Sequence, residues 1–141
     1  MTNSFDFPIE ILMAFGEAIK GKEEIRKWLF DNGYEHLGQL SLAISNDKIA
    51  FDWLVKHYPQ FAAFDRAIDN DTDAKIWLQQ NELTFDIVFA DACAGKADAI
   101  AWLAKNQLDI FIHLAKIVKT DIDQREQKTS SFLPFFNANK R

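Results

Sequence analysis

The sequence predicts an all-α protein, built as a short α-solenoid of about four to five stacked helix-turn-helix repeats. Four tryptophans lie 24 or 25 residues apart and each is followed by leucine, a regular spacing that is the signature of a repeat architecture. The chain also has only 5 Gly and 3 Pro in 141 residues, too few for the turns of a many-stranded β protein. The tryptophans are Trp28, Trp53, Trp77 and Trp102.

The first repeat shows how one unit is built. Residues 7–13 open its first helix. Residues 21–31 are rich in helix formers and place Ile25, Trp28 and Leu29 at the i, i+3, i+4 spacing of one amphipathic face. The same pattern returns in residues 95–105. Each unit therefore holds a second helix that ends shortly after its Trp-Leu pair.

The first helices of the next units carry an apolar stripe of their own. The two clearest stripes are Tyr34, Leu37, Leu40 and Ala43, and Tyr58, Phe61, Phe64 and Ala67. A short turn with Gly or Asn separates the two helices of a unit, and an acidic residue that favours a helix N-terminus follows it closely. We expect Asn32, Asn81 and Asn106, four residues after a Trp, to take the left-handed conformation that closes the second helix.

The last unit is degenerate. A helix near residues 108–119 should be followed by a partner, but residues 120–125 contain no Trp-Leu pair, as expected for a cap. We therefore predict one helical-repeat domain over residues 1–124 and a C-terminal tail over 125–141 that is capping or partly disordered. The apolar residues of the tail either fold back over the last helix pair or dock onto another subunit or partner.

An isolated pair of short helices cannot bury both apolar stripes, so successive pairs must stack and share one core. We expect the four tryptophans to form the structural core, each between neighbouring helices. Burying such a side chain is worth roughly 2 to 3 kcal/mol by area. Terminal units of such a stack have one uncovered face.

One segment resembles a known family. The sequence GKEEIRKWLFDNG of residues 21–33 is similar to the second-helix segment of ankyrin repeats, and residues 95–106 are a weaker copy. Ankyrin units are near 33 residues and open with a Thr-Pro-Leu-His segment before a β-hairpin, whereas these units have 24 or 25 residues and lack both. The resemblance implies an ankyrin-like helical array without the hairpin, and it implies protein binding without catalysis.

Charge and composition exclude several classes of partner. The net charge is −5, and residues 1–124 carry 20 acidic against 12 basic residues, or −8, so the body repels nucleic acid and anionic lipid. No run approaches the roughly 18 apolar residues of a membrane span, and the N-terminus lacks a secretory signal pattern. The single cysteine, Cys93, fits a reducing compartment. These observations predict a cytoplasmic protein that binds neither nucleic acid nor membranes.

No motif predicts catalysis, a metal site or a cofactor. Asp69, Asp71 and Asp73 alternate like the first ligands of an EF-hand loop, but Ala74 and Gln80 stand where its Gly and Glu belong, so helix capping explains these acids better. The three histidines lie in different units without metal-ligand spacing. Cys93 fills a slot that holds isoleucine in other units, so we expect a small core residue.

The sequence therefore predicts a non-catalytic protein-protein interaction module with an acidic surface, of inhibitor or immunity type or an adaptor. We expect a monomer or weak homo-oligomer whose partner is another protein, with basic surface charge. The alternative is a small enzyme or ligand-binding protein with a pocket between helices. The candidate partner-binding residues, chosen because exposed positions vary between units, are Glu35, His36, Arg66, Asp69, Asp71, Asp73 and Asp91.

Overall fold

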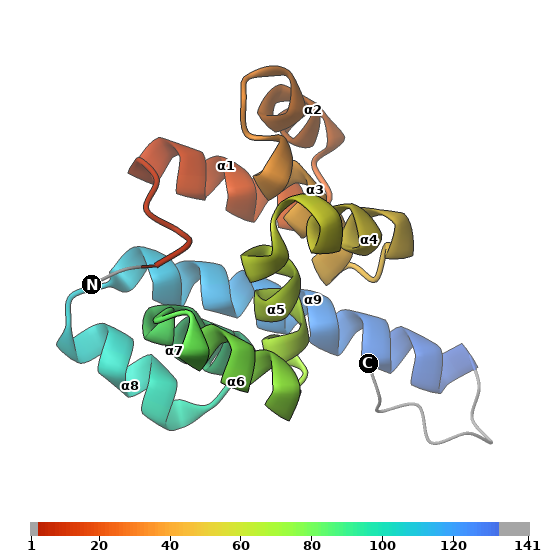
Figure 1. Ribbon diagram of the computed structural model, residues 1–141. Coiled ribbons are helices and arrows are strands. Elements are labelled where there is room, and N and C mark those ends of the chain that lie inside the picture. Colours follow the sequence, from red (N-terminus) through yellow and green to blue (C-terminus); the bar gives the residue numbers. More distant parts are fainter. Residues whose placement is uncertain (1–2, 133–141) are drawn as a thin grey trace.

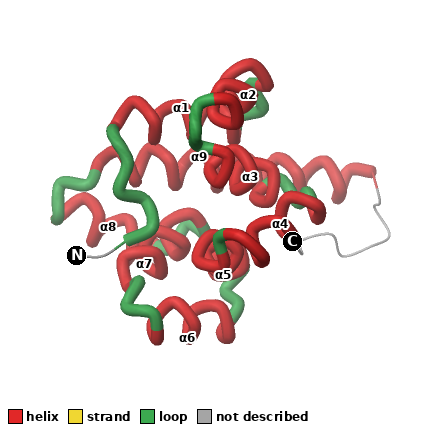
Figure 2. The backbone as a smooth tube through the Cα atoms, turned by 45° about the horizontal axis from the view of Figure 1, so that its top comes forward, coloured by secondary structure: helices red, strands yellow, loops and turns green. Residues whose placement is uncertain are grey.

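The structure is a computed structural model that describes residues 3–132, and it confirms the all-α prediction. This part of the chain forms nine helices joined by short turns and contains no strand (Figure 2). The helices are α1 (Ile9–Ile19), α2 (Glu23–Asp31), α3 (Glu35–Ile44), α4 (Lys48–His57), α5 (Pro59–Ile68), α6 (Thr72–Gln80), α7 (Thr84–Cys93), α8 (Ala97–Lys105) and α9 (Asp109–Phe132). No described helix combines the length and the apolar content that crossing a membrane needs.

The odd-numbered helices form the inside of the molecule and the even-numbered helices lie outside them. Each of α1, α3, α5 and α7 buries six residues at the repeat spacing, whereas α2, α4, α6 and α8 bury one or two each. Each even helix packs on the odd helix before it and on the odd helix after it. We call the two sets the inner and the outer helices.

The array is closed rather than open at its ends. Inner helices contact one another in the order α1, α3, α5, α7 and α9, and α9 also packs against α1. Figure 1 shows α9 running the length of the molecule with α1 on one side and α7 on the other. The contact between α1 and α9 is close at Gly16, where a methyl group would lie 2.9 Å from Leu114 Cδ2. The expected uncovered end faces of the inner helices are therefore paired with each other.

The leucine after each tryptophan, and not the tryptophan, is the core residue. Leu29, Leu54, Leu78 and Leu103 are fully buried. Trp28 is 46% exposed, so the prediction that it lies in the core is wrong. Trp53, Trp77 and Trp102 are half-buried and cover the edge of the core. Two adjacent residues of a helix point in different directions, so only one member of each Trp-Leu pair can face the centre of the core. In these helices that residue is the leucine.

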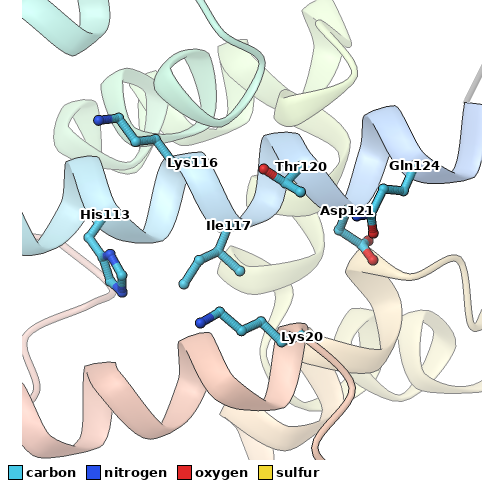
Figure 3. A pocket seen from close by; sticks show the side chains of 7 residues that line it. All are labelled: Lys20, His113, Lys116, Ile117, Thr120, Asp121 and Gln124. Carbon is cyan, nitrogen blue, oxygen red and sulfur yellow. The ribbon is translucent and has the colours of Figure 1, made fainter.

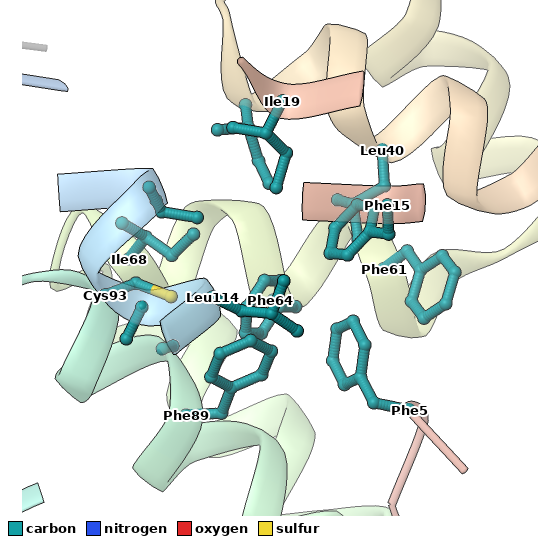
Figure 4. Packing of buried hydrophobic residues seen from close by; sticks show 14 of the residues in the cluster. Phe5, Phe15, Ile19, Leu40, Phe61, Phe64, Ile68, Phe89, Cys93 and Leu114 are labelled. Carbon is teal, nitrogen blue, oxygen red and sulfur yellow. The ribbon is translucent and has the colours of Figure 1, made fainter. Parts of the chain in front are cut away.

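The inner helices α1, α3, α5, α7 and α9 form a closed ring, and the N-terminal segment fills its middle. Phe5 is 1% exposed and its ring lies 4.7 to 5.2 Å from the rings of Phe61, Phe64 and Phe89, which belong to α5 and α7 (Figure 4). Phe15 of α1 is 6.3 Å away. The segment before the first helix therefore supplies the aromatic side chain on which three inner helices converge.

The helix ends differ from the prediction by one residue. Asn32, Asn81 and Asn106 do not adopt positive φ; instead each side-chain amide donates a 2.8 Å hydrogen bond to the carbonyl oxygen of the tryptophan four residues earlier. The left-handed conformation falls on the following residue, Gly33, Glu82 or Gln107. An asparagine that caps carbonyls with its side chain leaves the next residue to reverse the chain.

The predicted domain boundary after residue 124 falls inside a helix, because α9 runs without a break from Asp109 to Phe132. A single helix thus replaces both the last inner helix and the first part of the predicted tail. Residues 133–141, on which the prediction of a capping or docking tail falls, lie outside the described residues.

Candidate functional site

The predicted partner-binding residues do not form one surface. Glu35 and His36 lie at the beginning of α3, where the His36 ring stacks on Tyr58 and Phe61 at the beginning of α5. Arg66 lies at the end of α5, with its guanidinium 4.7 Å from the centre of the Phe51 ring. Inner helices α3 and α5 therefore run in the same direction, and their two ends are opposite ends of the molecule.

The remaining predicted acids lie near the Arg66 end, where Asp71 and Asp91 accept hydrogen bonds that belong to the fold. Asp71 is the N-cap of α6 and accepts a 3.0 Å hydrogen bond from the backbone N–H of Ala74. Asp91 accepts a 2.8 Å hydrogen bond from Lys75 and lies 3.3 Å from Lys96. The exposed acids of this group are Asp69 and Asp73. The predicted acidic edge is thus smaller than the sequence suggested.

His36 belongs to a row of stacked rings rather than to an open binding surface. The ring centroids of His36 and Tyr58 are 4.6 Å apart and those of His36 and Phe61 are 5.6 Å apart, with Tyr34 and Phe7 also in contact. Burial among these rings lowers the pKa of the His36 imidazole below its ordinary value, and the charge of Glu35 opposes this shift. Its main role is therefore packing between the beginnings of α3 and α5.

The lowered pKa of His36 predicts a loss of stability in mild acid. The unfolded chain binds the proton more readily than the folded chain, so the stabilisation is present above the unfolded pKa of about 6.5 and is lost as the pH falls through the folded pKa. We expect the melting temperature to fall as the pH drops below about 6.5, and to fall less in His36→Gln. His113→Gln, at an exposed position of α9, is the control. An equal fall in wild type and His36→Gln would contradict this account.

Sequence reasoning missed two buried polar residues that tie elements together. Arg26 is 7% exposed; its guanidinium donates to the Ala18 carbonyl at 2.6 Å and to the Ser41 hydroxyl at 3.0 Å, so α2 is bound to both α1 and α3. Asp86 is fully buried on α7 and accepts hydrogen bonds from the backbone N–H and the hydroxyl of Ser4. Burial raises the pKa of Asp86, and the Ser4 hydrogen bonds oppose that shift. A signal existed, because Asp86 occupies a repeat slot that is otherwise apolar.

The most distinctive surface is a groove between α1 and α2. Six large hydrophobic residues are exposed in the described part of the chain, and three of them, Ile9, Met13 and Trp28, lie on this helix pair. The groove has a volume of about 530 Å³. Its lining consists of Glu10, Ile11, Met13, Ala14, Glu17, Glu24, Ile25 and Trp28. We call this surface the α1–α2 groove: an apolar floor with three glutamates around it.

The sequence held a signal for the α1–α2 groove. The position three residues before the tryptophan is Ile25 in the first unit and Ala50, Ala74 or Ala99 in the others. Ala50 and Ala99 are buried, whereas the larger Ile25 is half-exposed. Ala74 is also half-exposed, but only Ile25 places a large apolar side chain at this position, and an exposed apolar surface of this kind is typical of a binding site.

A second cavity of about 440 Å³ lies beside this groove, along the line where α1 meets α9. Lys20 of α1 extends between α1 and α9 toward His113 and Ile117, and Lys116 of α9 also lines the cavity (Figure 3). Asp121 also lines the cavity but is paired with Arg125 at 3.1 Å. Two lysines, Lys20 and Lys116, therefore line this cavity, whereas three glutamates line the α1–α2 groove.

Within the described residues, no cluster of three or more His, Cys, Asp or Glu side chains could hold a metal ion. Cys93 is buried in the core, in the slot that isoleucine fills elsewhere. Comparison of the chain with protein-family models, with curated proteins and with solved structures finds no match. The geometry of the surface is therefore the basis for a functional proposal.

Proposed function

We propose that this protein is a non-catalytic interaction module that binds a basic partner protein through the α1–α2 groove. The observation that carries the proposal is the exposure of Met13 and Trp28 in one groove beside three glutamates. Contiguous exposed apolar surface rimmed by charge is typical of protein-binding sites, and tryptophan and methionine are enriched there. Inhibition of a basic protein and an adaptor role are both forms that this binding could take.

The acidic residues around the groove favour a partner with positive charge. Glu10, Glu17 and Glu24 line it, and residues 1–124 carry a net −8. Opposite charges on two surfaces speed their encounter, and salt screens this effect over about 10 Å at 0.1 M. We therefore expect a partner whose contact segment carries Lys or Arg beside apolar anchors, and an association rate that falls as salt is added.

The test compares two matched variants. Met13→Ser with Trp28→Ser alters the groove, and Ile49→Ser with Ile76→Ser removes two other exposed hydrophobic residues, from α4 and α6. Proteins captured from the native host by wild type are identified, purified and measured for binding to each variant. We expect the groove variant to lose at least about tenfold in affinity, because buried aromatic anchors carry most interface energy, and the control to bind like wild type.

A third variant tests the predicted acidic edge. Asp69→Lys with Asp73→Lys reverses two charges near the turn between α5 and α6, and neither residue lines the groove. If the purified partner binds the groove variant as well as wild type, the proposal is wrong. If binding is lost only in Asp69→Lys with Asp73→Lys, the partner uses the acidic edge and not the α1–α2 groove.

A further inference from the structure

The closed ring leaves one place for an outer helix vacant within the described part of the chain. Outer helix α2 packs on both α1 and α3, α4 on both α3 and α5, α6 on both α5 and α7, and α8 on both α7 and α9. Four of the five seams between inner helices are therefore covered. The fifth seam joins α9 to α1, and the two cavities described above lie on it and directly beside it.

The side chains at the vacant seam repeat those of an occupied one. In the covered seam, Asp91 of α7 pairs with Lys96 of the following turn at 3.3 Å and with Lys75 of outer helix α6 at 2.8 Å. At the vacant seam, Glu17 has the repeat position of Asp91, and Lys22 has the position of Lys96 and lies 3.4 Å from Glu17. Only the lysine of the outer helix has no counterpart.

Lys20 takes part of that missing role. Its ammonium group lies 3.3 Å from Glu17, and Figure 3 shows the side chain lying in the space between α1 and α9. Lys20 is exposed, and an exposed ion pair of this kind contributes little stability, so a partner's lysine can replace Lys20 beside Glu17 at little cost. The contact between an outer helix and this repeat position also recurs elsewhere, since Phe51 of α4 lies under Arg66 of α5.

We infer that the α1–α2 groove and the α1–α9 seam together receive one amphipathic helix of a partner protein, which takes the place of a fifth outer helix. This inference rests on the proposed function and names the form of the partner. The outer helices α2, α4, α6 and α8 have 9 or 10 residues, so the docked segment needs about three turns. Its apolar residues pack on Met13, Ile25 and Trp28. A Lys or Arg of the docked helix faces Glu17, as Lys75 of α6 faces Asp91.

The experiment uses the protein's own outer helix as a probe. A fluorescent, helix-stapled peptide with the sequence of residues 71–81 contains α6 and its cap, including Lys75; the staple is needed because isolated helices this short are marginal. A second peptide carries Lys75→Glu. Each is titrated into the full-length wild-type chain and into Glu17→Lys, and fluorescence anisotropy gives four dissociation constants.

We expect either single charge reversal to weaken binding by about tenfold, and the two reversals together to restore most of that loss. Trp28→Ser should weaken both peptides, and the control Ile49→Ser should weaken neither. Restoration by the double reversal is specific to a helix lying in the vacant place, because it requires residue 75 of the peptide to face residue 17.

Several outcomes would overturn the inference. If peptide binding depends on Trp28 but the two charge reversals together do not restore affinity, the groove is still a binding site, but the peptide does not occupy the place of an outer helix. Peptide binding that appears only after residues 133–141 are deleted assigns the place to the chain's own C-terminus. If the chain forms a dimer that the peptide dissociates, a second copy of the chain occupies the vacant place. Absence of peptide binding while a purified natural partner still needs Met13 and Trp28 rejects the helix but leaves the proposed function standing.

Discussion

Replacing Phe5 with alanine should lower the free energy of unfolding by about 3 to 5 kcal/mol. The Phe5 ring is buried where α1, α5 and α7 converge, and its removal leaves a cavity lined by Phe15, Phe61, Phe64 and Phe89. These rings belong to different inner helices, so they cannot all move in to fill it. Urea unfolding followed by tryptophan fluorescence gives the difference from wild type.

Phe7→Ala is the matched control. Phe7 is two residues away in the same segment, but it is only half-buried at the edge of the core, where its ring contacts Tyr34 and His36. We expect a clearly smaller loss than for Phe5→Ala. Equal losses would mean that the whole N-terminal segment, and not Phe5 in particular, contributes to stability. A loss below about 1 kcal/mol for Phe5→Ala would show that the inner helices do not close around the Phe5 side chain.

Leu29→Ala should destabilise the protein by about 2 to 5 kcal/mol, whereas its neighbour Trp28→Ala should cost below about 1 kcal/mol. Leu29 is fully buried between α1, α2 and α3, but Trp28 is 46% exposed and rests on Tyr34 at 6.2 Å. The same urea titrations measure both. The reverse order would restore the tryptophans to the core and remove the basis for Trp28 as a binding residue.

The repeat spacing was enough to predict the helices and their pairing, because apolar periodicity directly reports which residues share a helix face. It could not decide between the two members of the Trp-Leu pair, since both lie on the same apolar stripe. It also could not predict closure. Whether α1 meets α9 depends on the small rotation between successive pairs, and no residue pattern within one repeat encodes that rotation.

Non-repeated segments were the least predictable part of the fold. Phe5 lies before the first unit, where no periodicity marks it as buried, and the end of α9 carries polar residues that do not reveal the helix. The candidate site failed for a similar reason. Glu35 and Asp69 both vary between units, but variation does not say at which end of the inner helices a residue lies. The resemblance to ankyrin repeats remains a prediction.

The contact between α1 and α9 closes the ring of inner helices and creates the vacant place for an outer helix. Nuclear Overhauser effects between the Gly16 Hα protons and the methyl groups of Leu114 and Ile117 measure it directly. The structure predicts strong cross-peaks, since a methyl group at Gly16 would lie 2.9 Å from Leu114 Cδ2 and 3.1 Å from Ile117 Cδ1. Absence of these cross-peaks, while contacts such as Phe85 to Trp102 within one unit are observed, would contradict the closed ring.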